Sequence, residues 1–320
     1  MLNVTVEGDR VRIGERFAVS FHRTLRIPDD GRSYPLPPGL GRFPIERVAD
    51  FPGAMPGSWH DHNGVIIPLY QREALWIGFE AAAWKPNAVK IGVGGVNAVT
   101  GAAWDDRLRA DPQDYLVSPP QAWLDGVNSG DGRVLQFVAM PLGMGYTLEA
   151  QMTDAESIGG IQILVFEPRP GRFPDRPPEK PPGPPEVLRA PAMGLGAGGQ
   201  IRQKLYADPY RVEAWDADNR GRVHVHLVNS DQYRELTGKS PPPTPVDAKA
   251  YIAHDLPWFD LYDEGLPHLP PAAPLIGAKT IRELDTVLGR EPGSEEQSFN
   301  VPEQRIHRQQ LAQAESESDE

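Results

Sequence analysis

The sequence predicts a mainly β protein, an antiparallel sandwich or barrel-like sheet, with a smaller α+β C-terminal part and a disordered acidic tail. Two observations carry this prediction. Short segments in which apolar and polar residues alternate recur through the first half, and Gly and Pro clusters separate them. None of these segments alternates with a long helical pattern, as the strands of a parallel nucleotide-binding sheet do. Many short strands joined by turns are typical of sandwiches and barrels.

The expected strands follow directly from this alternation. Leu2, Val4 and Val6 alternate with polar neighbours at the N-terminus, and the following Gly8-Asp9 marks a turn. Further apolar runs predict strands around residues 11–13, 17–21, 65–67, 74–79, 89–93, 134–140 and 161–166.

Proline content divides the chain. Ten prolines from Pro168 to Pro191 exclude a helix or a central strand there. We therefore expect a β-rich domain at 1–167, an extended Pro-rich linker or surface loop at 168–192, an α+β part at 193–289 that can share the same core, and the acidic tail at 290–320. A docking role for the Pro-rich segment, in an aromatic groove of a partner, is the alternative to a simple connection.

Capping residues predict three helices after the Pro-rich segment. Ser230 can cap a helix through Leu236, which Gly238 would end. Thr244 begins a second, which should run to about His254, and Thr280 with Glu283 forms a capping box for a third that ends near Gly289.

Composition limits the classes of function. The formal net charge is -12, half of it from eight acidic residues and two arginines at 291–320, so nucleic acid and anionic membrane surfaces lose their electrostatic attraction. No run of about 18 apolar residues is present that would span a membrane. The chain has no cysteine, which excludes disulfides and thiol chemistry. We expect a cytoplasmic protein, without a signal peptide, that binds a protein partner or forms a homo-oligomer.

Two His-x-His pairs are the most conspicuous chemical feature. His224 and His226 alternate with valines in an expected strand, so both project to one side. His60 and His62 flank Asp61 in the other pair, and could complete a site for a divalent transition metal such as zinc or iron. A metal-bound water would then support a hydrolase or an oxygenase. The alternative is an ordinary polar strand face, with 216–221 as an Asp-rich turn leading into it.

Acidic and aromatic residues also occur together, which suggests carbohydrate binding or cleavage. Trp104-Asp105-Asp106, Trp123-Leu124-Asp125 and 257–264 show this combination. The competing interpretation is that these rings anchor loops to the core. From the sequence we expect a non-enzymatic binding or assembly protein, with metal-dependent hydrolysis or oxygenation, and then carbohydrate recognition, as alternatives. No catalytic residue or organic cofactor is predicted.

Overall fold

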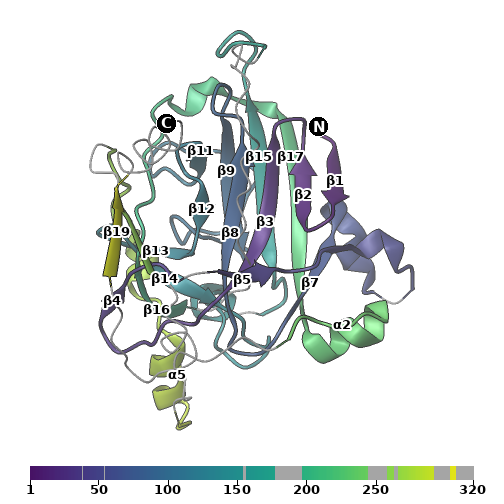
Figure 1. The fold of residues 1–320 in the computed structure, drawn as a ribbon, viewed down its shortest axis with the longest axis vertical. Helices are drawn as coiled ribbons and strands as arrows, with labels where there is room; N and C mark the ends of the chain where they lie inside the picture. The colour runs from purple at the N-terminus through teal and green to yellow at the C-terminus, as the bar shows by residue number, and fades with distance from the viewer. Residues whose placement is uncertain are drawn as a thin grey trace, which may run out of the picture.

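Two β-sheets form the protein, and few helices accompany them (Figure 1). The computed structural model describes residues 1–37, 39–53, 55–153, 156–176, 197–243, 258–262, 266–291 and 303–307. The predicted mainly β fold is confirmed. Most of the acidic tail, most of the Pro-rich segment and the expected helix at 244–254 lie outside the described residues; within the tail, residues 290, 291 and 303–307 are described, the last five as a strand.

The first sheet has ten strands. Its main path runs β1 (Val4–Glu7), β2 (Arg10–Ile13), β3 (Phe17–Thr24), β8 (Ala74–Ala81), β14 (Arg133–Val138), β16 (Ala197–Arg202) and β4 (Ser33–Tyr34). The side strands are β5 (Gly39–Arg42) on β3, β12 (Trp123–Leu124) on β8, and β13 (Gly126–Gly130) on β14. All pairs are antiparallel except β16 with β4.

The second sheet has seven strands. Its order is β10 (Val96–Asn97), β9 (Asn87–Val93), β15 (Ile161–Pro168), β17 (Trp215–Asn229), β7 (Val65–Leu69) and β6 (Glu46–Arg47), with β11 (Leu116–Ser118) also paired to β9. Here β17 and β7 form the parallel pair. A separate parallel pair joins β18 (Trp258–Tyr262) to β19 (Glu303–His307).

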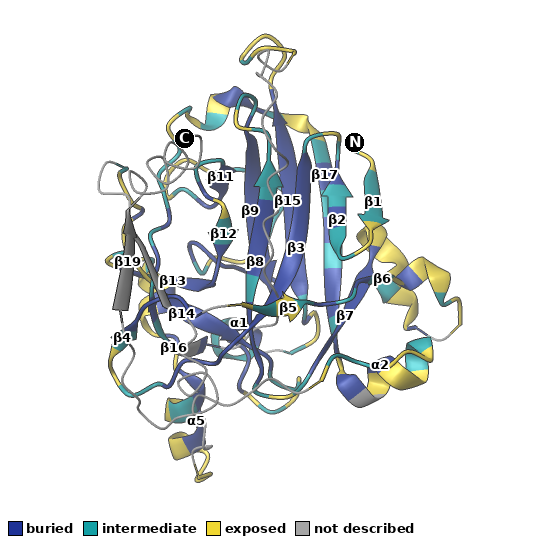
Figure 2. Cartoon of the chain, viewed as in Figure 1, coloured by how far each residue is buried: buried dark blue, intermediate teal, exposed yellow. Residues whose placement is uncertain are grey.

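The two sheets enclose a common core. Apolar residues that alternate along the strands of both sheets belong to one buried cluster, for example Phe21 on β3, Ile91 on β9, Ile163 on β15 and Val223 on β17. The central strands are buried along most of their length, whereas exposed residues gather around α2 and the segment before β7 (Figure 2). Strands on both sides of 168–192 contribute to both sheets, with β16 and β17 coming from the C-terminal side.

The helices are short. The α-helices are α1 (Leu148–Thr153), α2 (Ser230–Thr237), α4 (Ala273–Ile276) and α5 (Ile281–Val287), and the 3-10 segments are η1 (Val48–Asp50), η2 (Gly57–Asn63) and η3 (Val212–Ala214). The predicted helices at Ser230 and Thr280 are confirmed, the latter with its reciprocal capping box to Glu283. None of the helices in the described ranges is long and apolar enough to cross a membrane.

One local prediction is correct only in part. Residues 216–221, expected to form a turn, belong to the long strand β17. The pairing of β17 with β15 shifts register between Phe166 and Pro168, so the Asp-rich segment is an irregular part of a strand. Residues 216–219 have no partner in β15, and there the backbone N–H of Asp218 donates to the Asp216 carboxylate at 3.0 Å, a local hydrogen bond of the kind that a turn uses.

Candidate functional site

The histidine strand is the middle of the second sheet. β17 lies between β15 and β7, with Val223 and Val225 fully buried in the core between the sheets. His224 and His226 therefore face the outer side of this sheet, as the strand alternation predicts. Their ring centroids are 4.2 Å apart.

His226 is a buried, uncharged histidine. Its side of the sheet is covered by Trp59 of η2, whose ring stacks on the imidazole with centroids 4.3 Å apart and planes 9° apart. Burial lowers the pKa of His226 to about 3, the neighbouring His224 contributes to this, and the backbone carbonyl of Trp59 opposes it. The Nε2 atom is buried and has no hydrogen-bond partner.

His224 uses its Nε2 atom within the protein. That atom lies 2.8 Å from the side-chain nitrogen of Gln162, and the Gln162 oxygen accepts from the backbone N–H of Gly95, which defines the orientation of the amide. Because an amide NH2 group only donates, Nε2 of His224 is the acceptor and its lone pair is occupied. Burial also lowers the pKa of His224.

The second His-x-His pair lies in η2, which packs against β17. Its backbone is kinked at Asp61 and His62, and His62 lies close enough to His224 to lower the pKa of that residue further. His60 is exposed. In the described part of the chain no three His, Asp or Glu side chains are placed to hold a metal ion. The four-histidine metal site stays a prediction.

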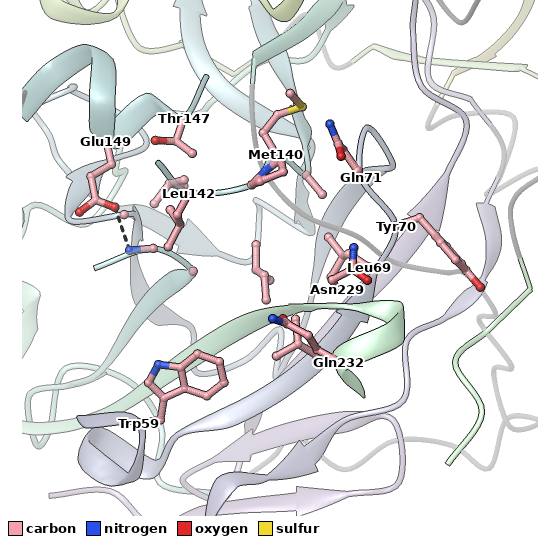
Figure 3. Close-up of a pocket in the computed structure, with 18 of the residues that line it drawn as sticks. Trp59, Leu69, Tyr70, Gln71, Met140, Leu142, Thr147, Glu149, Asn229 and Gln232 are labelled. Atoms are coloured by element: carbon pink, nitrogen blue, oxygen red, sulfur yellow. Dashed lines mark hydrogen bonds between the residues drawn. The ribbon is translucent and has the colours of Figure 1, made fainter. Parts of the chain in front are cut away.

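A pocket of about 630 Å³ lies beside the histidine pair (Figure 3). Trp59 forms part of its wall, as do Gly159 and Gly160, whose loop runs against His224. Gly160 has a φ of 60°, and a Cβ atom there would clash with the carbonyl of Val225. The pocket size is typical of small-molecule sites.

The wall of the pocket is more apolar than polar. Its apolar members come from η2, β7, the loop after β14, the end of β17 and α2, among them Trp59, Leu69, Met140, Leu142, Leu227 and Leu236. Figure 3 also places the side-chain amides of Gln71, Asn229 and Gln232 around the pocket. Leu142 is half-exposed at 49%, so apolar surface at the pocket is open to solvent.

Glu149 of α1 also lines the pocket but is held by the backbone. It is 2% exposed, and its carboxylate accepts hydrogen bonds from the backbone N–H groups of Ser157, Ile158 and Gly159 at 2.7–2.9 Å. The bond from Gly159 is drawn in Figure 3. Three donors compensate a buried carboxylate charge, so Glu149 fixes the loop that shapes the pocket.

The acidic side chains beside Trp104 are engaged in ion pairs. Lys90 has a side chain 1% exposed, and its Nζ lies 2.8 Å from Asp105 and 2.7 Å from Asp114. Burial alone would raise the pKa of Asp105, but hydrogen bonds from Arg109 and Lys90 outweigh it and hold the pKa well below its usual range. The Trp104 ring lies 5.5 Å from the Lys90 Nζ. These groups are joined to one another and are not members of the pocket wall.

Asp125 is the acidic residue of the second aromatic cluster. Its carboxylate accepts from the indole N–H of Trp123 at 2.6 Å, and the side-chain oxygen of Gln203 accepts from its backbone N–H. Burial raises the pKa of Asp125 to about 7, against the lowering effect of Trp123. Of the third cluster, only the backbone of β18 lies within the described residues.

No family model matches this sequence, and no curated protein or solved structure matches it significantly.

Sequence reasoning missed the pocket. Its wall combines residues from segments spread between Pro56 and Leu236, most of which are ordinary apolar residues or glycines. The one local signal was the spacing of Gln232, Glu235 and Leu236, which places these residues on one face of α2. That spacing does not reveal what the face meets.

Proposed function

We propose that the protein is a non-enzymatic binding protein whose ligand occupies the pocket between η2, α1 and α2. The observation that carries this proposal is a largely apolar cavity of about 630 Å³ whose wall combines residues from strands of the second sheet, from loops and from helices α1 and α2. Deep apolar pockets with a few polar groups are the usual form of small-molecule sites. The neutral histidines support the pocket wall, because the ring of His226 stacks on Trp59 and His224 lies against the Gly159 loop.

Nile red, an uncharged dye that fluoresces in apolar surroundings, tests this proposal. We expect saturable binding to the full chain, followed by fluorescence titration. Gln232→Trp places a bulky ring at an exposed helix position that lines the pocket, and should weaken binding at least tenfold. Arg234→Trp is the matched control, because Arg234 is an exposed residue of the same helix that does not line the pocket.

The result that would contradict the proposal is equal binding to both variants, since the dye would then occupy another surface. Absence of binding to the unmodified chain would contradict it as well. Thermal unfolding of each variant shows whether it is folded, so a loss of binding can be separated from a loss of structure.

Metal-dependent hydrolysis or oxygenation is the alternative proposal, and it requires His60, His62, His224 and His226 to rearrange. The occupied Nε2 of His224 weighs against it, and the buried, unpartnered Nε2 of His226 is the one feature in its favour. A protein partner or a second copy of the chain also remains a proposal, which the native molecular mass would test.

A further inference from the structure

The charged residues that line the pocket are of one sign. Two acidic residues, Glu149 and Glu235, belong to its wall, and the residues described as lining it include no Lys, Arg or His. The charge of Glu149 is compensated by three backbone N–H groups. Glu235 is exposed, and within the described residues no basic side chain pairs with it. The uncompensated charge of the pocket is therefore negative, which disfavours an anionic ligand.

The aromatic rings of the pocket wall also favour a cationic over an anionic ligand. Trp59 and Tyr70 both line the pocket, and the electron-rich faces of such rings attract cations. One face of Trp59 is covered by His226, which is uncharged at neutral pH and so does not cancel that attraction. Tyr70 is held in place because its hydroxyl donates to the carbonyl of Pro242 at 3.1 Å.

Helix α2 places the acidic group next to apolar surface. Gln232, Glu235 and Leu236 are spaced i, i+3 and i+4, and all three line the pocket. A ligand whose charged group lies at Glu235 would thus place its apolar part against the wall formed by Leu236 and Leu227. The layout fits a molecule with a charged end and an apolar body.

We propose that the ligand of this pocket is a small cationic amphiphile, with an ammonium group at Glu235 and an apolar chain along the wall. This inference rests on the proposed binding function and names its ligand class. An ammonium ion near an exposed carboxylate gains a modest attraction, which salt weakens.

Three probes with the same eight-carbon chain test the inference by isothermal titration calorimetry on the full chain: octyltrimethylammonium, 1-octanol and octyl sulfate. The two ionic probes are used below their micelle concentrations, and 1-octanol is used below its solubility limit. We expect octyltrimethylammonium to bind about fivefold more tightly than 1-octanol at low salt, as exposed ion pairs contribute on this scale. Octyl sulfate should bind more weakly than 1-octanol. Salt at about 0.5 M should reduce the cation preference, because it shortens the Debye length.

Glu235→Gln removes the charge while keeping the size of the side chain, and should bring octyltrimethylammonium and 1-octanol to equal affinity. Glu213→Gln is the control: it makes the same charge change at an exposed residue of η3 outside the pocket wall, and should keep the preference. Equal binding of the probes to the unmodified chain, or a preference that survives Glu235→Gln, would overturn the inference.

The outcomes separate the two proposals. If Nile red binds in the pocket but the cation has no advantage, the binding function stands and the ligand class is wrong. If Nile red and all three octyl probes fail to bind, both proposals are wrong.

Discussion

Replacement of His226 by Phe should make the protein less sensitive to acid. In the native state the imidazole is 4% exposed, stacked on Trp59, and its pKa is lowered from 6.5 to about 3. A phenyl ring keeps the stack and removes the titrating group. The lost hydrogen bond to the Trp59 carbonyl is partly offset because the buried Nε2, which has no partner, is removed as well.

The sign of the pH effect follows from proton linkage. Below pH 6.5 the unfolded chain binds a proton at this histidine and the native protein does not, so native stability falls as the pH falls towards 3. Between pH 7.5 and pH 5, protonation of this histidine stabilises the unfolded state by about 2 kcal/mol, because pH 5 lies about 1.5 pH units below the unfolded pKa. Because the native pKa lies well below 5, the native protein takes up almost no proton at His226 in this interval.

Urea unfolding at pH 7.5 and pH 5 measures the effect. Between these pH values the native protein should lose about 2 kcal/mol more of its free energy of unfolding than His226→Phe does. His60→Phe is the matched control, since His60 is an exposed residue of η2, and it should follow the unmodified protein. Equal losses in the unmodified protein and His226→Phe would refute the assigned burial of His226.

The other predictions concern buried charges and metal. Asp125→Asn should stabilise the protein at pH 8 by up to about 4 kcal/mol. The pKa of the native carboxyl is raised from 3.8 to about 7, so the protein loses stability as the pH rises through this range and the buried carboxyl ionises, whereas a neutral amide does not ionise. The gain should vanish below pH 4, and Asp131→Asn, at an exposed residue, should show no such gain. Lys90→Met should lower the free energy of unfolding by about 3–5 kcal/mol, because Asp105 and Asp114 lose the buried cation that they share. Lys239→Met, at an exposed ion pair, should lower it by less than about 0.5 kcal/mol, and equal losses in chemical unfolding would contradict the buried network. Elemental analysis of tag-free protein should find less than about 0.1 equivalent of transition metal. A stoichiometric metal content would instead favour the metal alternative, provided that chelation removes the metal and lowers the melting temperature.

Local patterns determined much of the fold. Apolar residues at alternate positions identified β1, β3, β9 and the histidine strand, and a nearly continuous apolar run identified β15, because the core takes up the side chains on at least one face of a strand. β3, β9 and β15 are buried along their whole length, which alternation alone does not reveal. The helix after Thr280 was predictable because its capping box is a local signal, and the helix at Ser230 because Gly238 ends it, although the Ser230 hydroxyl makes no capping hydrogen bond.

Pairing across the chain decided what local patterns could not. The Asp-rich segment 216–221 belongs to β17 because the residues at its two ends pair with β15, Trp215 with Pro168 and Arg220 with Phe166, although 216–219 have no partner in β15 and keep a local, turn-like hydrogen bond. The aromatic and acidic cluster at Trp104 became an ion-pair network because Lys90, on β9, is buried beneath it. Neither partner is visible from the residues of the segment alone.

For the site, the sequence alone determined that His224 and His226 share one face of a strand, because side chains two apart on a strand point the same way. Only the tertiary structure decided what that face does. Trp59 covers His226, Gln162 occupies the Nε2 of His224, and the residues around them enclose a pocket. The physical reason is that the protonation and lone pairs of an imidazole depend on burial and hydrogen-bond partners, which come from elements far apart in the chain.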